Sequence, residues 1–276
     1  MSTDLSGEER FNIASERPFF VSAPKDRPDV IAHRGGAREW PPETIFAFRK
    51  AIDRGVDVLE FDVRRTADNA IVLMHNPTVD DTTDGSGYVR HKTLKELKKL
   101  NAAARWTNLK SERIDIPTLT EVFALLEKFP TIRFIIEIKD RDLWLANAVG
   151  QLIELEGIQD NVLIASGWDT ILMAFRRDYP RVATSASVLE ILAFKARVNL
   201  VAGNYLPNTD AIQWHSRFLG VPVITRSYVK RAKSLDLVVH GWTVNRPREM
   251  KRMIKLGVDG IITDYPTKLL KILGRI

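Results

Sequence analysis

The sequence contains no cysteine among its 276 residues. That absence excludes disulfide bonds, thiolate nucleophiles and zinc sites built on cysteine. The chain also lacks any run of about 18 apolar residues, so it is predicted to have no membrane-spanning helix. Residues 1–28 lack the basic start and the apolar core of a signal peptide, and we therefore expect a cytoplasmic protein.

Acidic residues are fewer than basic ones, which gives a net charge of +6 and a pI near 9.5. The excess is concentrated in residues 90–113, where eight lysines and arginines stand against two glutamates. Such a cluster is typical of a solvated helix face, but it also suits a phosphate-bearing substrate or weak contact with an anionic membrane surface. No binding motif accompanies the charge, so we do not expect a nucleic-acid partner.

Short apolar runs alternate with segments of helical spacing along most of the chain. The runs fall at residues 30–33, 58–63, 134–139, 162–165, 182–185, 200–203, 237–244 and 260–264. The helical segments are 44–54, 119–129, 143–156, 169–178, 188–197, 228–235, 247–256 and 266–273. Eight strands that alternate with helices predict an α/β fold of the (β/α)8, or TIM-barrel, type. We expect residues 29–276 to form this barrel, preceded by an N-terminal tail at residues 1–28.

One connection breaks the alternation. Residues 66–70 favour a turn, and residues 71–74 are predicted to return as the second arm of a hairpin, which brings His75 back beside the second strand. Residues 76–117 then hold the basic cluster and a short helical segment. We interpret them as a small insertion after the second strand, over the mouth of the barrel, where loops carry function.

Two carboxylates share one face of the second predicted strand. Glu60 and Asp62 are two residues apart, so their side chains point to the same side at a spacing of about 7 Å along the strand. If they are buried together, a cation or a proton must offset their desolvation and repulsion. A solvated strand end is the alternative interpretation.

Other predicted strands also end in residue types that a barrel core normally avoids. The first ends at His33, the third carries Glu137 and Lys139, and the seventh carries Trp242. In a TIM barrel these carboxyl ends form the active-site face. Three carboxylates without cysteine favour Mg²⁺ or Ca²⁺ over zinc, while His33 and His75 suit general acid and base work near neutral pH. The remaining histidines lack such neighbours and are predicted to be structural: His91, His215 and His240.

In this order, the motifs of the chain resemble those of the glycerophosphodiester phosphodiesterases. The resemblance covers roughly residues 30–266. Its blocks are AHRGG (32–36), Thr44 with Ala47 and Phe48, EFDV (60–63), His75, residues 80–87, IPTL (116–119), IEIK (136–139), WTVN (242–245) and GVDGIITDYP (257–266). It implies a metal-dependent phosphodiesterase on a TIM barrel with an inserted region after the second strand.

The resemblance also implies a reaction and its residues. A glycerol hydroxyl would attack phosphorus to give a cyclic phosphate, which water would open to yield glycerol 3-phosphate and a free alcohol. Arg34 and Lys139 would hold the phosphate oxygens, a role that their positive charge suits independently. The implied acid and base are His33 and His75. The implied metal ligands are Glu60, Asp62 and Glu137. The implied substrate-binding residues are Arg34, Lys139 and Trp242.

Four positions differ from the family pattern. The family reads Pro-Glu-Asn-Thr where residues 41–44 read Pro-Pro-Glu-Thr, so Pro42 takes the glutamate position and Glu43 the asparagine position. A local backbone shift would let Glu43 substitute for the missing glutamate. Asn76 stands where an aspartate usually follows the second histidine, and Asp81 stands where an arginine is common. We expect these changes to alter leaving-group preference or metal binding.

Three functional hypotheses follow. The first is metal-dependent hydrolysis of glycerophosphodiesters. The second keeps the reaction but takes lysophospholipids as substrates, with Phe19, Phe20, Tyr88 and Trp106 facing a lipid aggregate. The third is a barrel that binds phosphodiesters without turning them over. The alcohol moiety of the substrate and the oligomeric state are left open.

Overall fold

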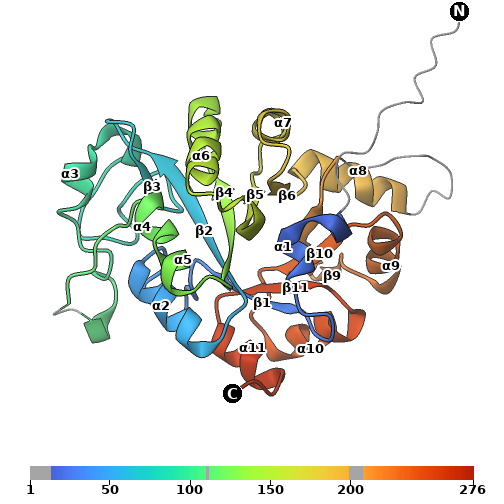
Figure 1. Cartoon of the computed structure of the whole chain (residues 1–276). Helices are drawn as coiled ribbons and strands as arrows, with labels where there is room; N and C mark the ends of the chain where they lie inside the picture. Colours follow the sequence, from blue (N-terminus) through green and yellow to red (C-terminus); the bar gives the residue numbers. More distant parts are fainter. Residues whose placement is uncertain (1–13, 110–111, 199–207) are drawn as a thin grey trace, which may run out of the picture.

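The computed structural model describes residues 14–109, 112–198 and 208–276. In this part of the chain, parallel strands form a nearly closed barrel in the order β6-β5-β4-β2-β1-β11-β10-β7 (Figure 1). The barrel strands are β1 (Asp29–His33), β2 (Val58–Arg65), β4 (Arg133–Ile138), β5 (Val162–Ala165), β6 (Ala183–Thr184), β7 (Ala211–His215), β10 (Val238–Trp242) and β11 (Gly260–Thr263). The predicted TIM barrel is confirmed.

The barrel closes between β6 and β7 through a few backbone hydrogen bonds. The Ala186 N–H donates to the carbonyl of Ala211 (2.7 Å), and the Asp210 N–H donates to that of Thr184 (3.0 Å). Alternate side chains of the strands fill the interior with small and branched residues, and the other side chains pack against the surrounding helices. The interior is therefore a packed core up to its two ends.

Helices follow the strands and cover the outside of the barrel. They are α2 (Ile45–Arg54), α4 (Leu119–Phe123), α5 (Leu125–Lys128), α6 (Leu143–Leu155), α7 (Asp169–Asp178), α8 (Val188–Val198), α9 (Arg226–Ser234), α10 (Pro247–Leu256) and α11 (Pro266–Ile272). Local chemistry sets their ends. The Thr44 hydroxyl accepts the N–H of Ala47 at the start of α2, Thr118 and Glu121 form a capping box, and Gly257 ends α10 with φ of 73°.

The structure differs from the sequence predictions at one strand and one helix, and one further prediction falls on residues that are not described. The strand predicted at 200–203 lies outside the described residues, and the barrel strand before β10 is β7, which was not predicted. Its pattern was obscured because the inward-facing Gln213 is polar; Gln213 lies 3.2 Å from Nδ1 of the buried His240. The helix predicted at 119–129 is divided at Ala124, where ψ is −12° and the helical turn tightens.

Part of the N-terminal tail closes the end of the barrel at which the strands begin. The 3-10 helix η1 (Ala14–Glu16) and α1 (Pro18–Val21) place Phe19 and Phe20 in the interior cluster, where they are 1% and 5% exposed (Figure 1, dark blue). The interpretation that these phenylalanines face a lipid aggregate is wrong, because barrel side chains cover them. Arg133 fixes the segment by donating to the Phe19 carbonyl (3.1 Å) and to the buried carboxylate of Asp29 (2.5 Å).

The insertion after β2 is a small unit with its own core. The strand β3 (Ile71–Leu73) pairs antiparallel with β2, which confirms the predicted hairpin. The short helices η2 (Val89–His91), α3 (Leu94–Leu97) and η3 (Thr107–Leu109) follow, and the unit lies to one side of the barrel beside β2 (Figure 1, teal). Its core residues are Val72, Met74, Val79, Val89, Leu97, Ala102 and Ile116. The remaining short elements are η4 (Gln159–Asn161), β8 (Arg217–Phe218) and β9 (Val221–Pro222).

Asp57, just before β2, ties three parts of the chain together. Its carboxylate accepts hydrogen bonds from Arg27 (2.8 and 2.9 Å), from the Val30 N–H (2.8 Å) and from Arg275 (2.8 Å). Burial alone would raise the pKa of Asp57, but these bonds outweigh it and the pKa is lowered. The stability that this carboxylate contributes is therefore present above the ordinary aspartate pKa of about 3.9, and it is lost as the pH falls through the lower folded-state pKa.

We expect Asp57→Asn to lower the free energy of unfolding by about 1–3 kcal/mol, because it weakens charge-assisted hydrogen bonds at a mostly buried site. Urea unfolding at neutral pH measures the loss, which should shrink as the pH falls below about 4. As a control, Asp115→Asn removes the exposed pair with Arg113 (3.3 Å). That control should cost less than about 0.5 kcal/mol, and equal losses in both variants would contradict this account.

Candidate active site

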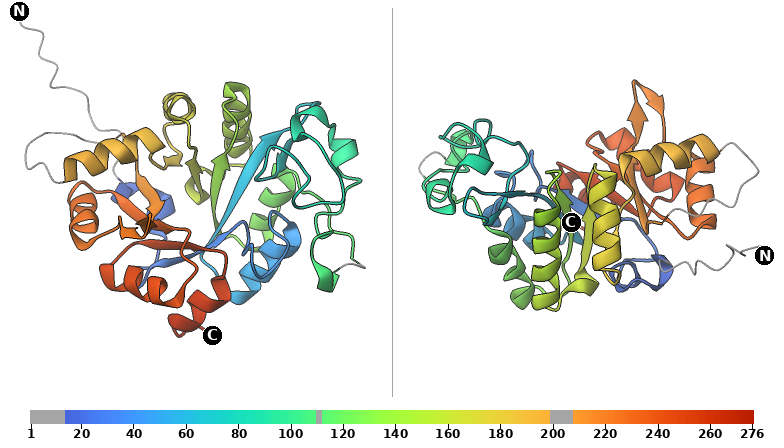
Figure 2. Two further views of the ribbon diagram at one scale, coloured as in Figure 1. Left: turned by 180° about the vertical axis from the view of Figure 1, so that it is seen from behind. Right: turned by 90° about the horizontal axis from the view of Figure 1, so that it is seen from above.

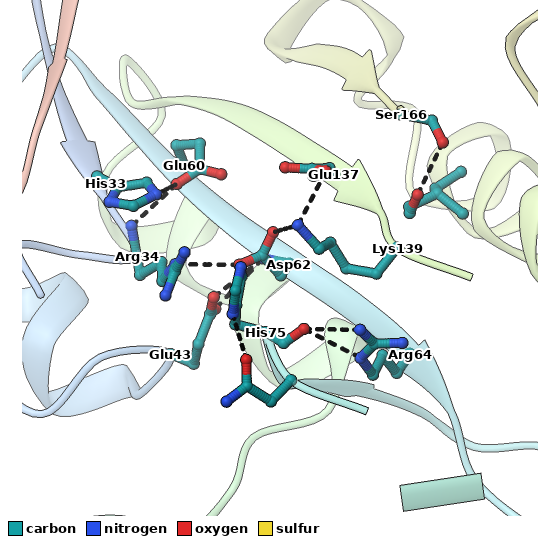
Figure 3. A network of polar contacts seen from close by, with 12 residues as sticks. His33, Arg34, Glu43, Glu60, Asp62, Arg64, His75, Glu137, Lys139 and Ser166 are labelled. Carbon is teal, nitrogen blue, oxygen red and sulfur yellow. Dashed lines mark hydrogen bonds and ion pairs between the residues drawn. The ribbon is translucent and has the colours of Figure 1, made fainter. Parts of the chain in front are cut away.

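Polar residues converge at the carboxyl ends of β1, β2 and β4 (Figure 3). The register of the parallel strands causes this convergence, because His33 pairs with Glu60 and Asp62 pairs with Glu137. Neighbouring strands lie about 4.8 Å apart, so side chains at paired positions on one face come into contact range. The structure thus brings together residues that are far apart in the sequence.

Three carboxylates form the centre of the site. Oxygen atoms of Glu60, Asp62 and Glu137 all lie within 4.8 Å of one another. Glu60 and Asp62 are buried, whereas Glu137 is partly exposed at the mouth. Two cationic side chains lie against this acidic trio: Arg34 Nε is 3.2 Å from Asp62, and Lys139 Nζ is 2.9 Å from Glu137 and 3.4 Å from Asp62.

Burial and mutual repulsion set the electrostatics of the acidic trio. Burial raises the pKa of Glu60 to about 7 and also raises the pKa of Glu137, with the Asp62 charge adding to both shifts. For Asp62, burial acts in the same direction, but the charges of Lys139 and Arg34 outweigh it and the pKa is lowered. A group of carboxylates in this setting is stable only beside positive charge.

The donor set of the trio fits a hard divalent cation. Mg²⁺ and Ca²⁺ prefer carboxylate oxygens, and the trio offers three such groups without sulfur or imidazole ligands among the described residues. Both side-chain oxygens of Asp62 are buried, and each lies beside one cationic nitrogen, Oδ2 at 3.2 Å from Arg34 and Oδ1 at 3.4 Å from Lys139. Neither oxygen accepts a well-aligned hydrogen bond in the described chain, so both keep lone pairs for a cation. Asp62 thus has the environment of a metal ligand.

His33 is held from the opposite side of its ring. Its Nδ1 lies 2.5 Å from Oδ1 of Asp264, and its Nε2 lies 3.9 Å from Glu60 at the edge of the trio. Asn245 orients Asp264 by donating to the other carboxylate oxygen (2.6 Å) and by accepting the Asp264 N–H (2.9 Å). Burial alone would lower the pKa of His33, but the charges of Glu60 and Asp264 outweigh it and the pKa is raised.

His75 is held by Asn76, and Asn76 by Asp81; these are two of the four residues that differ from the family pattern. Its Nδ1 lies 2.6 Å from Oδ1 of Asn76, and the Asn76 amide donates a hydrogen bond to Asp81. Arg64 fixes the backbone here by donating to the His75 carbonyl (2.7 Å) while it pairs with Asp140. Burial lowers the pKa of His75, although the Asp62 charge opposes the shift. The departures at 76 and 81 therefore form a complementary pair.

Glu43 reaches the site from the loop before α2. Its backbone has φ of 59°, a left-handed conformation, and its buried carboxylate accepts the Asp62 N–H at 3.2 Å (Figure 3). Burial and the adjacent Asp62 charge raise the pKa of Glu43 well above its ordinary value. Glu43 thus supports Asp62 from behind and does not belong to the group of three facing carboxylates.

Aromatic residues line the mouth beside the trio. The Trp242 ring lies 6.2 Å from the His33 ring and 4.5 Å from the His215 ring. A pocket of about 140 Å³ opens here and is bounded by Glu60, Glu137, Trp214 and Trp242 among others. A larger hollow of about 670 Å³ lies between α6 and α7, on the outside of the barrel and away from these residues.

Several residues of the site were not assigned by sequence reasoning. Asp264 and Asn245 lie within blocks that carry the family resemblance, but nothing in a single sequence shows that they orient His33. His215 was expected to be structural; its ring packs against Trp242 at the mouth, with the two ring planes inclined by 35°. His240 fits the structural expectation, since complete burial lowers its pKa to about 3 and keeps it neutral inside the barrel.

Comparison with known proteins agrees with this geometry. The sequence profile of the glycerophosphoryl diester phosphodiesterase family matches residues 33–268, which is most of the chain. The chain belongs to this family. It is 34% identical over 252 residues to a glycerophosphodiester phosphodiesterase of Caldanaerobacter subterraneus subsp. tengcongensis, covering 89% of this chain and 98% of that relative. It is 29% identical over 246 residues to the Bacillus altitudinis enzyme of the same name, covering 88% and 97% of the two chains.

Solved structures of the family share the fold. A phosphodiesterase of Oleispira antarctica, in complex with the product sn-glycerol-3-phosphate, superposes with a TM-score of 0.76 at 23% identity and covers 90% of this chain and 97% of its own. The Agrobacterium tumefaciens glycerophosphodiester phosphodiesterase gives a TM-score of 0.71 at 22% identity, covering 88% of this chain and 99% of its own. The fold of this chain is thus known from solved structures of the family.

Thermal unfolding tests the fit of a cation to the acidic trio. Added Mg²⁺, Ca²⁺ or Mn²⁺ should raise the Tm of the wild-type protein, because a ligand at 100 times its Kd stabilises the folded state by about 2.7 kcal/mol. Glu137→Gln should lose most of this rise, since it removes one of three charged ligands. The exposed Glu154→Gln on α6 serves as the control and should respond like the wild type. Equal responses in all three proteins would contradict a site at the trio.

Proposed function

We propose that the protein hydrolyses glycerophosphodiesters to glycerol 3-phosphate and an alcohol, with a divalent cation at the acidic trio and two histidines as acid and base. One observation supports this most strongly: a trio of carboxylates, two of them buried, has His33 beside Glu60, while His75 and two cationic side chains gather around Asp62 (Figure 3). A phosphodiester needs an anion-binding centre with proton carriers on both sides of phosphorus.

Substrate binding follows from the charges around the trio. The guanidinium of Arg34 and the ammonium of Lys139 can hold the non-bridging phosphate oxygens, since both lie within 3.4 Å of Asp62 at the edge of the site. Glu60, Asp62 and Glu137 would hold the cation, which when bound supplies Lewis-acid stabilisation of charge on the phosphate oxygens. Trp242 walls the same space and excludes water from one side.

The hydrogen-bond partners of the two histidines divide their roles. Nδ1 of His33 faces the carboxylate of Asp264, which stabilises a positively charged imidazolium, so His33 suits the general acid. Nδ1 of His75 faces the amide oxygen of Asn76, which fixes a neutral ring with its proton on Nδ1. The lone pair on Nε2 of His75 is then available for the general base.

The reaction proceeds in two proton-balanced steps. His75 takes the proton of the neighbouring glycerol hydroxyl as its oxygen attacks phosphorus, and His33 gives a proton to the departing alcohol oxygen. The product is a cyclic phosphate. His33 then takes a proton from water as the water oxygen attacks phosphorus, and His75 returns its proton to the glycerol oxygen, which releases glycerol 3-phosphate.

Incubation with glycerophosphocholine or glycerophosphoethanolamine tests the proposal. Glycerol 3-phosphate should appear with a divalent cation and disappear with EDTA. His33→Ala and His75→Ala should each lower kcat at least about 10²-fold, because each removes a proton carrier. His91→Ala, whose ring lies 5.4 Å from Tyr88 in the insertion, should keep full activity.

The same assay separates the other hypotheses. Faster release of choline from lysophosphatidylcholine than from glycerophosphocholine would move the substrate assignment to lysophospholipids. Cation-dependent substrate binding without any product would identify a binding barrel and contradict the proposal. Full activity in both histidine variants would refute the acid-base assignment.

The pair at positions 76 and 81 offers a test of how His75 is oriented. Asn76→Asp places two carboxylates in contact, which should misorient His75 and lower kcat by about 10-fold or more with little change in KM. The double variant Asn76→Asp with Asp81→Asn reverses donor and acceptor and should recover most of the loss. Steady-state kinetics of both variants measures the recovery; equal activity of the single and double variants would contradict the pairing.

A further inference from the structure

A short hairpin carries the most exposed apolar residues near the mouth. It consists of β8 (Arg217–Phe218) and β9 (Val221–Pro222), joined by Leu219 and Gly220. Phe218, Leu219 and Val221 are 58%, 88% and 65% exposed. Soluble proteins seldom gather large apolar side chains on one protruding turn unless a partner covers them. In the right-hand view of Figure 2 the hairpin (orange) stands out from the body of the barrel.

The turn at the tip of the hairpin has a leucine where a polar residue is usual. Leu219 and Gly220 both have positive φ, at 47° and 80°, as the two-residue turn of a tight hairpin requires. Asn or Asp normally occupies the first of these positions, because a polar side chain tolerates the left-handed backbone. A leucine there is unfavourable for the hairpin itself and solvates poorly. The residue choice indicates that the side chain serves contact with an apolar environment.

The base of the hairpin is rigid, so the tip is held outward. The Val223 N–H donates to the Ser216 carbonyl (3.1 Å), which closes the hairpin. Arg252 on α10 donates to the carbonyls of Ser216 (2.9 Å) and Ile224 (2.8 Å). Arg217 pairs with Glu249 at 3.2 Å. These contacts clamp both strands to α10, and the apolar tip extends beyond them.

The hairpin lies on the same face as the acidic trio. It follows the carboxyl end of β7, and in a TIM barrel all such connections surround the active-site mouth. The start of α8, which follows β6, adds exposed Val188, Leu189 and Leu192 on this face. Val188 also lines the pocket beside Glu60 and Glu137. Apolar side chains at the start of α8 thus reach the edge of the pocket, on the face that also carries the hairpin.

Basic residues begin the helices next to this surface. Arg226 is the first residue of α9, and Arg246 and Arg248 flank the start of α10; all three are exposed. The N-terminus of a helix carries partial positive charge, so arginines there are unfavourable unless an anion lies nearby. Together with the net charge of +6, they favour an anionic partner.

We propose that the β8–β9 hairpin and the start of α8 dock on an anionic lipid bilayer. The tip residues Phe218, Leu219 and Val221 enter the boundary between headgroups and acyl chains, while Arg226, Arg246 and Arg248 face the lipid phosphates. The surface combines an apolar tip with a basic surround, as interfacial binding requires. This inference goes beyond the proposed hydrolysis, and docking can be measured without turnover.

The absence of cysteine makes a site-specific probe straightforward. Leu219→Cys and Leu155→Cys each create one thiol for an environment-sensitive fluorophore; Leu155 is 79% exposed at the end of α6, which is the opposite end of the barrel. Equimolar vesicles of phosphatidylcholine and phosphatidylglycerol should shift the emission of the probe at 219 to the blue. The probe at 155 should not respond, and a silent probe at 219 would overturn the proposal.

Co-sedimentation with the same vesicles tests the surface in unlabelled protein. Phe218→Ser with Leu219→Ser should lower the partition coefficient by at least about tenfold, because burying one leucine is worth more than one tenfold step. Leu155→Ser should bind like the wild type. Arg246→Ser with Arg248→Ser should weaken binding to the anionic vesicles, as should raised salt. Equal binding of hairpin and control variants would overturn the proposal.

Sedimentation velocity tests the alternative that the hairpin contacts a second copy of the chain instead of a membrane. If the hairpin mediates self-association, the serine variant will change the sedimentation coefficient while neither protein binds vesicles, and the membrane proposal is then wrong. Turnover of the soluble substrate glycerophosphocholine should be the same in hairpin variant and wild type. An inactive wild type that still binds vesicles would refute the proposed hydrolysis and leave the docking surface supported.

Discussion

The mouth of the barrel is organised by the cost of placing three carboxylates next to one another, two of them buried. Glu60, Asp62 and Glu137 come together because the strand register leaves them no other position. Desolvation and repulsion of such a group amount to several kcal/mol unless positive charge is at hand. Arg34 and Lys139 supply part of it from the ends of their own strands, and the donor set suits a divalent cation for the rest. The positive charge that the carboxylates require also provides a binding centre for a phosphate.

Each histidine beside the trio depends on its own partner for orientation. Asn245 holds Asp264, which faces His33, and Asp81 holds Asn76, which faces His75. The two rings also differ in proton affinity: the charges of Glu60 and Asp264 raise the pKa of His33 against its burial, whereas burial lowers the pKa of His75. The substitution of Asn and Asp for the usual Asp and Arg keeps one donor and one acceptor in contact. In this chain the Asn76 amide and the Asp81 carboxylate are in contact, so the two departures from the family pattern match each other.

Most of the fold could be predicted from the sequence because its signals are local. Alternation with period two places Glu60 and Asp62 on one face, and cap residues such as Thr118 set helix ends. The failures arise where a tertiary contact overrides the local signal. The strand β7 was not predicted because its polar Gln213 breaks the apolar pattern, although this side chain contacts His240 inside the barrel. Phe19 and Phe20 were interpreted as a surface patch because the sequence does not show that the barrel interior buries them.

The site residues follow the same division. The convergence of strand ends predicts His33, Glu60 and Glu137, because the topology alone brings these ends together. The loop positions are different, since the side chain of Glu43 reaches Asp62 only through a left-handed backbone that no sequence pattern specifies. Asp264 likewise acts through a contact with a residue 231 positions away. Contacts between residues so far apart in the sequence can be identified only from a three-dimensional structure.

Diffraction at the manganese absorption edge, from crystals grown with Mn²⁺, would locate the cation relative to the acidic trio. One anomalous peak should lie in contact with carboxylate oxygens of Glu60, Asp62 and Glu137, and it should be lost in Glu137→Gln crystals. A peak elsewhere, or no peak at a Mn²⁺ concentration that supports turnover, would contradict the assignment of the acidic trio as the metal centre.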